Sequence, residues 1–164
     1  VSKVFSMTGW RIGYGAGNKE IIKSIAKIQS QSTTNPCSIS QMAAKFALDN
    51  EKKFLIDWLK EFDQRKNFLI NYFNSIDGFE PFIPEGAFYL YVSCKGFISK
   101  RGINGQLIKN DFDFAEYLLM NAKVAVVPGL AFGMSPYFRI SYATSLNDLK
   151  DACEQISASI KNLQ

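Results

Sequence analysis

The feature that most constrains the fold is a long helical pattern in the middle of the chain, from Glu51 to Ile76. Its apolar residues recur every three or four positions, and the pattern stops at Asp77-Gly78, a typical helix end. The apolar positions are Phe54, Leu55, Trp58, Leu59, Phe62, Leu69, Phe73 and Ile76. At 1.5 Å per residue such a helix spans roughly 39 Å, longer than a small core needs. We therefore expect it to connect two domains.

Composition limits the class of protein. The chain has 164 residues, of which 47% are hydrophobic and 21% charged, a composition typical of a soluble globular protein. The net charge of +4 is modest and the basic residues are spread among acidic ones, so we expect neither nucleic acid nor a membrane as partner. No signal peptide and no apolar run near the length of a membrane span is present, and we expect a cytoplasmic protein.

Cysteine and histidine usage narrows the chemistry. The cysteines Cys37, Cys94 and Cys153 are odd in number and widely spaced, which fits unpaired thiols in a reducing compartment better than a disulfide framework. The chain has no histidine, which excludes a Ser-His-Asp triad and a His-ligated metal centre within it. We expect no metal site.

Two cations lie close together at the beginning of the chain, Lys3 and Arg11. Two short apolar runs, expected to start as a strand, flank a turn centred on Gly9 and would place the two side chains on neighbouring segments. Lysine forms Schiff bases with carbonyls, whereas arginine binds phosphate or carboxylate through its planar fork. The pair indicates an anionic ligand with its carbonyl at Lys3 and its phosphate at Arg11. The alternative is a solvated lysine and an arginine packed on Trp10.

Gly13, Gly15 and Gly17 follow this stretch and precede a helix with Asn18 as its N-cap. These glycines do not have the spacing of a dinucleotide-binding or phosphate-binding loop, and they are not followed by the lysine and serine of a P-loop. A turn between a strand and a helix is therefore the better interpretation. The helix is expected to bury Ile21, Ile22, Ile25 and Ile28. After a polar loop over 29–36, a second helix is expected to start with a capping box and to bury its apolar face. That box is Ser38 with Gln41, and the face is Ile39, Met42, Ala43, Phe46 and Ala47.

After the long helix the pattern alternates between strands and helices. Strands are expected over 79–83 and 87–93 around the turn Pro84-Glu85-Gly86, over the β-branched run 124–127, and over 137–142. The stretch 94–110 is expected to be a solvated loop. Asn110 or Asp111 should cap a helix that turns Phe114, Ala115, Leu118 and Leu119 inward, and Ser145 with Asp148 should cap the last helix. The last helix is expected to pack through Leu149, Ala152, Cys153, Ile156 and Ile160.

Arg139 lies in an apolar strand with no evident acidic partner. Alternation puts Phe138, Ile140 and Tyr142 on one face of that strand and Arg139 on the other. A poorly solvated guanidinium is costly unless it is paired, and a substrate carboxylate would be a natural partner. A protein carboxylate is the alternative.

Four segments resemble the class I pyridoxal-phosphate-dependent aminotransferases, in order along essentially the whole chain: SKVFSMTGWRIGYGAG, PEGAFYLYV, VAVVPGLAFG and FRISYA. The sequences MTGWRIGYGAG and QSTTNPCSISQMAA most resemble the bacterial aspartate aminotransferase branch, some members of which also use prephenate as a substrate. The resemblance implies an α/β fold of fold-type I, namely the C-terminal edge of the large domain plus the small α+β domain. Residues 1–50 would belong to the large pyridoxal-phosphate-binding domain, 51–77 to the connecting helix and 78–164 to the small domain.

The resemblance also implies the site and the reaction. Lys3 would hold pyridoxal phosphate as a Schiff base, Arg11 would bind the cofactor phosphate, and Arg139 would clamp the substrate α-carboxylate. An amino group would pass from an L-amino acid, aspartate foremost, to a 2-oxo acid such as 2-oxoglutarate or prephenate, in a homodimer.

The chain begins with Val rather than Met, in the middle of an expected strand and with Lys3 as its third residue, and we expect a fragment of a longer protein that is inactive alone. One alternative is another fold-type I enzyme, a decarboxylating synthase or a carbon–sulfur lyase, and another is a non-catalytic small-domain fragment. The determinants of side-chain specificity would lie largely outside this sequence.

Overall fold

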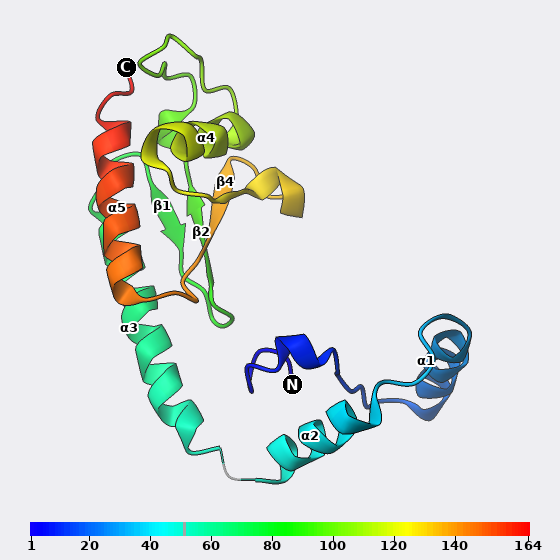
Figure 1. Ribbon diagram of the computed structural model, residues 1–164. Coiled ribbons are helices and arrows are strands. Elements are labelled where there is room, and N and C mark those ends of the chain that lie inside the picture. The colour runs from blue at the N-terminus through cyan, green and yellow to red at the C-terminus, as the bar shows by residue number, and fades with distance from the viewer. Residues whose placement is uncertain (51) are drawn as a thin grey trace. The chain divides into compact units, whose positions relative to one another are not determined.

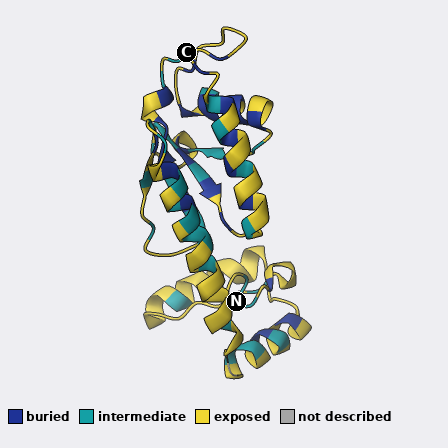
Figure 2. Ribbon diagram, turned by 90° about the vertical axis from the view of Figure 1, so that its left-hand side faces the viewer, coloured by how far each residue is buried: buried dark blue, intermediate teal, exposed yellow. Residues whose placement is uncertain are grey.

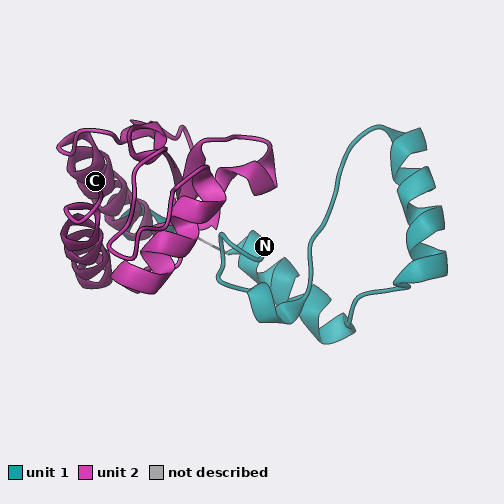
Figure 3. Ribbon diagram, turned by 90° about the horizontal axis from the view of Figure 1, so that it is seen from above, with its two compact units in different colours: residues 1–57 teal, residues 58–164 magenta. Residues whose placement is uncertain are grey.

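The computed structural model describes residues 1–50 and 52–164 (Figure 1). The chain divides into two compact units, Val1–Asp57 and Trp58–Gln164 (Figure 3). The division falls inside helix α3, Phe54–Asn74, which is the long helix expected from the sequence. It begins at Phe54 and ends at Asn74, before Gly78, whose φ of +99° glycine adopts without strain. The predicted start of the helix, Glu51, lies outside the described residues. None of the helices in the described part is long and apolar enough to cross a membrane.

The first unit consists of turns and two separate helices. Residues 1–6 form local turns, with the amide of Ser6 donating to the carbonyl of Lys3 at 3.2 Å, and a short 3₁₀ helix η1 follows over Thr8–Trp10. The expected strand at the start of the chain is therefore wrong, and so is the strand-to-helix turn at Gly13–Gly17, because an irregular stretch leads into α1 instead. Helix α1 spans Lys19–Ser32, and helix α2 spans Ser38–Asp49.

The two helices keep their predicted periodicity but not their predicted burial. Asn18 caps α1 as expected, accepting from the amide of Glu20 at 2.9 Å, yet α1 has no buried residue (Figure 2). On α2, Ile39 and Phe46 are each 70% exposed. Helix periodicity records which face is apolar, but burial requires a second layer, and the described residues of the first unit leave α1 uncovered and α2 only partly covered.

The predicted capping box of α2 is also wrong. Cys37 occupies the N-cap position and makes no side-chain capping bond. The side-chain Nε2 of Gln41 donates instead to the carbonyl of Pro36 at 2.9 Å, which ties the loop to the first turn of the helix.

The second unit is built on a four-stranded antiparallel sheet with the order β1-β2-β4-β3. The strands are β1, Glu80–Phe82; β2, Tyr89–Ser93; β3, Val127–Pro128; and β4, Tyr137–Ser141. Helices α3, α4 (Asp111–Tyr117) and α5 (Leu146–Ile160) contribute to the same core. Helices α3 and α5 are joined by the hydroxyl of Tyr72, which donates to the carbonyl of Cys153.

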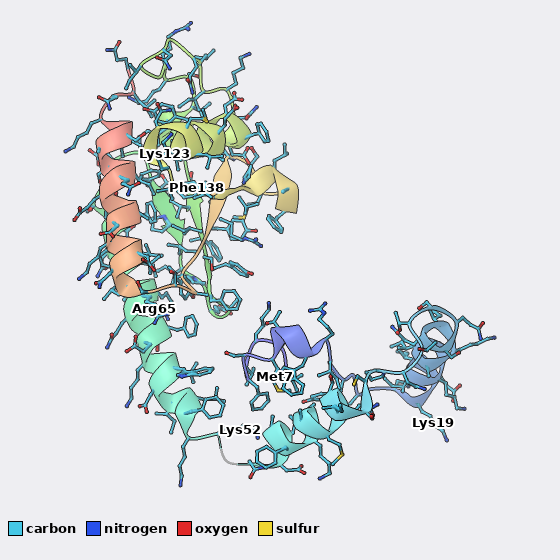
Figure 4. The ribbon with its side chains drawn as sticks, in the orientation of Figure 1. Met7, Lys19, Lys52, Arg65, Lys123 and Phe138 are labelled. Carbon is cyan, nitrogen blue, oxygen red and sulfur yellow. The ribbon has the colours of Figure 1, made fainter. Side chains whose placement is uncertain are left out.

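The core of this unit lies on one face of the sheet. Alternate residues of β4, Phe138 and Ile140, are buried, as the alternation predicted. The ring of Phe138, labelled in Figure 4, lies within 6 Å of three other rings, those of Phe73, Phe79 and Phe114. Such edge-to-face and tilted contacts add to the free energy gained by burying the rings. The other face of the sheet carries Arg139.

Three local expectations for the second unit need correction. The stretch 94–110 is not a simple solvated loop, because it contains the 3₁₀ helix η2 (Lys95–Phe97) and buries Phe97 and Ile108. The β-branched run forms a strand only at Val127, where it pairs with β4. Leu119 is 50% exposed, in a π-helical turn η3 over Leu118–Ala122.

The expected helix caps of this unit are clearer. Asn110 caps α4 by accepting from the amide of Asp113 at 2.9 Å, which decides between the two candidates. Asp111 is instead fully buried. The Ser145–Asp148 capping box of α5 is confirmed.

Candidate functional site

Lys3 and Arg11 lie on one short segment that is folded back on itself. The hydroxyl of Thr8 donates to the carbonyl of Ser2 at 3.1 Å, and the Nη1 of Arg11 donates to the carbonyl of Thr8 at 2.9 Å. Arg11 itself is in the left-handed region, with φ of +50°. The two cations therefore lie on a segment of consecutive turns and not on the neighbouring strands that the sequence suggested.

The side chains of both cations are exposed, whereas the segment between them is anchored. Met7, labelled in Figure 4, is buried and lines an open apolar pocket of about 390 Å³ between this segment and α2. The lining residues are Phe5, Met7, Trp10, Ala43, Phe46, Ala47, Asn50 and Phe54. This anchor was not predicted, although the apolar residues interleaved with Lys3 and Arg11 are a signal for it. The anchor leaves the amine and the guanidinium on the solvent side.

Arg139 projects from the half-buried face of the sheet and lies between two aromatic rings. Its guanidinium carbon is 4.2 Å from the centroid of the Tyr89 ring and 4.3 Å from that of the Phe132 ring. Contact with the face of a ring stabilises a cation, and arginine stacks particularly well because its guanidinium is planar. With both faces covered, the N–H donors point outward in the plane of the group.

No residue that the structure describes forms an ion pair or a hydrogen bond with the guanidinium of Arg139. The alternative in which a carboxylate of this chain neutralises the guanidinium is therefore not realised within residues 1–50 and 52–164. A stacked guanidinium with unused in-plane donors is suited to bind a carboxylate through two parallel hydrogen bonds.

The two rings come from two of the segments that resemble the family, PEGAFYLYV and VAVVPGLAFG, although neither residue was predicted to contact Arg139. Tyr89 begins β2, and Phe132 ends the 3₁₀ helix η4, Gly129–Phe132. Strand register explains the first contact, because Arg139 pairs directly with Tyr91 and the neighbouring same-face position on β2 is Tyr89. The contact with Phe132 depends on the loop after β3, which no periodicity predicts.

The three cysteine thiols lie in different environments. Burial raises the pKa of Cys94 and of Cys153 to about 12, so both stay protonated at neutral pH. Backbone N–H groups of Ser40 and Ile39 lower the pKa of the exposed Cys37. In the described part of the chain no three acidic, cysteine or histidine side chains gather as a metal site would require.

The aminotransferase class I and II family model matches residues 1–156. The chain belongs to this family. It is 50% identical over 163 residues to a probable aspartate/prephenate aminotransferase of Rickettsia typhi, covering 99% of this chain and 41% of that protein. It is also 50% identical to an aspartate aminotransferase of Rhizobium meliloti, covering 99% of this chain and 40% of that protein. The chain thus spans about 40% of the length of these curated relatives.

Solved structures support the fold expected from the resemblance. A crystal structure of the Rhizobium meliloti aspartate aminotransferase matches with a TM-score of 0.94 and 50% identity, over 99% of this chain and 41% of that one. A mutant aspartate aminotransferase of Thermus thermophilus matches with a TM-score of 0.83 and 35% identity, over 96% and 41%. The expected fold-type I class is therefore confirmed, with a small antiparallel sheet in the second unit.

Proposed function

We propose that the protein to which this chain belongs transfers an amino group from an L-amino acid, aspartate foremost, to a 2-oxo acid such as 2-oxoglutarate or prephenate. The observation that carries the proposal is Arg139, stacked between Tyr89 and Phe132 with no anionic partner in the described part of the chain. The printed names of the relatives, aspartate and aspartate/prephenate aminotransferases, support the choice of substrates.

The residues present fit pyridoxal phosphate. Lys3 offers an amine and Arg11 a guanidinium on the same folded segment, both on its exposed side, and only the Nη1 of the Arg11 guanidinium is hydrogen-bonded within the described residues. These two groups would hold the carbonyl and the phosphate of the cofactor, respectively. When bound, the cofactor supplies an electron sink for the bond broken at the substrate Cα.

The remaining roles fall to side chains of this chain. The Nζ of Lys3 would accept the proton from the substrate Cα as a general base and would then give it to the cofactor as a general acid. Arg139 would bind the α-carboxylate through its in-plane N–H donors and so fix the direction of the Cα–H bond. Holding the reacting group in orientation can lower a barrier by several kcal/mol.

We further propose the division expected from the family, with residues 1–50 in a large cofactor domain, 51–77 as the connecting helix and 78–164 as a small domain. The family resemblance supports a homodimer located in the cytoplasm.

Arg139→Lys in the longer protein tests the proposal. Lysine keeps the charge but loses the planar fork, and a hydrogen bond to a charged group contributes about 1.5 to 3 kcal/mol. We expect kcat/KM for amino acids to fall about tenfold to hundredfold, since about 1.4 kcal/mol is a factor of ten. Amines that lack an α-carboxylate should react almost as before.

Equal slowing of both substrate types, or an unchanged rate with amino acids, would show that Arg139 is a structural residue. Identification of the product formed from the amino acid is the second part of the test. A decarboxylated or cleaved product in place of a 2-oxo acid would favour a synthase or a lyase of the same fold.

A further inference from the structure

Asp111 is a buried carboxylate without a cationic partner among the described residues. It is the first residue of α4 and is fully buried. Its Oδ2 accepts from the amide of Leu130 at 2.7 Å, and its Oδ1 accepts from the hydroxyl of Ser135 at 2.5 Å. Burying a carboxylate is costly, and these two hydrogen bonds offset only part of that cost. We therefore expect Asp111 to be kept in this position because it fixes the amide of Leu130 and the hydroxyl of Ser135.

Those groups are the two ends of one loop. Within the loop, the amide of Met134 donates to the carbonyl of Gly129 at 3.0 Å, and the amide of Gly133 donates to the carbonyl of Leu130 at 3.0 Å. A Cβ on Gly129 would lie 1.9 Å from the carbonyl oxygen of Met134, so only glycine allows this closure. One carboxylate thus joins the beginning and the end of a tightly closed turn.

Phe132 lies between the two clamped ends. Its ring covers one face of the Arg139 guanidinium at 4.3 Å and meets the ring of Tyr91 edge to face, with 6.1 Å between centroids. The other face of the guanidinium is covered by Tyr89, which belongs to the sheet. One side of the arginine is therefore held by a strand, and the other by a loop whose closure depends on Asp111.

We infer that Asp111 is a positioning residue for the carboxylate-binding arginine: by fixing the 129–135 loop it places Phe132 and thereby orients Arg139. The inference rests on the proposed function, because it assigns Arg139 to the substrate carboxylate. Asp111 touches neither substrate nor cofactor in this role. Its effect should appear in recognition of the carboxylate rather than in proton transfer.

The experiment compares kcat/KM for an amino acid and for the matching amine without α-carboxylate, using the longer protein with its cofactor. Asp111→Ala removes both contacts to the loop, and we expect the ratio of the two values to fall about tenfold, mainly through KM for the amino acid. Phe132→Leu should lower the same ratio while leaving the Asp111 contacts in place. Because Phe132 is 50% exposed, this variant carries little risk to folding.

Two further variants separate positioning from stability. Asp111→Asn can keep both contacts, with its amide oxygen accepting from Leu130 and its amide N–H donating to the Ser135 hydroxyl, and we expect the ratio to return to within about threefold of the parent. Tyr72→Phe is the matched control, because it removes hydrogen bonds to Cys153 and Ser157 on α5. It should lower Tm and leave the ratio unchanged.

The inference is overturned if Asp111→Ala slows both substrates equally, or lowers only Tm as Tyr72→Phe does. If Asp111→Ala fails to fold, Phe132→Leu and Ser135→Ala decide, and an unchanged ratio in both overturns it. The Arg139→Lys result separates the two proposals. When that variant discriminates against amino acids and the loop variants do not, only the role of Asp111 fails; when it does not discriminate, the proposed function fails and this inference fails with it.

Discussion

The two units have the same kind of amphipathic helices, but their apolar side chains are buried to very different extents. In the first unit, Met7, Ser40 and Ala44 are the buried residues among those described, although α1 and α2 both carry continuous apolar faces. In the second unit, three helices and a sheet share one core rich in phenylalanine. An amphipathic helix is stabilised mainly by the layer that it packs against, so equal periodicity gives unequal stability where the layer differs.

The candidate site residues are also held differently in the two units. The cations assigned to the cofactor, Lys3 and Arg11, lie on the exposed side of a segment in the first unit, whereas Arg139 is held by strands and a clamped loop in the second. Relatives of this chain are more than twice as long. The comparison therefore predicts that function in the first unit depends on the longer protein, and that stability in the second does not.

The largest expected effect is the loss of all turnover in the 164-residue chain by itself. We expect only Lys3 and Arg11 to hold the cofactor here, and we assign no group of this chain to its ring nitrogen. The purified chain is mixed with amino acid, 2-oxo acid and pyridoxal phosphate, and formation of the new amino acid is followed. Steady transamination by a preparation free of the longer protein would contradict the comparison.

Lys3→Ala in the longer protein should abolish the visible absorption of a lysine-linked imine and lower kcat by about 10²–10⁴-fold, the usual contribution of a general acid–base group. Absorption spectra with and without an amino acid make the measurement. An unchanged spectrum would remove Lys3 from the site.

Phe73→Ala and Phe46→Ala form a matched pair in the 164-residue chain. Phe73 is fully buried, so its truncation should lower the free energy of unfolding of the second unit by about 3–5 kcal/mol. Phe46 is 70% exposed, and its truncation should cost less than about 0.5 kcal/mol. Urea denaturation followed by circular dichroism compares the two. Equal losses would mean that the first unit has a core of its own.

The smallest effects concern two helix caps. Ser145→Ala removes the capping box of α5 and should lower the stability of the second unit by about 1 kcal/mol. Asn18→Ala removes the same kind of bond from α1, which buries no residue, and should only speed amide exchange within α1. Hydrogen exchange resolved by peptide measures both. A global loss of protection in Asn18→Ala would contradict the idea that α1 is uncoupled from a core.

Local sequence chemistry predicted much of the second unit correctly. The β4 alternation around Arg139, the Ser145–Asp148 box and the position of the long helix depend on neighbouring residues and on the period of the backbone, which a sequence records directly. In the first unit the same periodicity located α1 and α2 correctly but predicted burial that the unit does not provide.

The sequence by itself therefore determined the helices, the faces of the strands, the family and the choice of Lys3, Arg11 and Arg139 as candidates. Only the tertiary structure decided that Tyr89 and Phe132 enclose Arg139 and that Asp111, a rejected helix cap, closes the loop carrying Phe132. These contacts join residues from β2, α4, η4 and β4, whose separation along the chain has no period. Their geometry is set by sheet register and by the closure of a glycine turn, which exist only once the chain has packed.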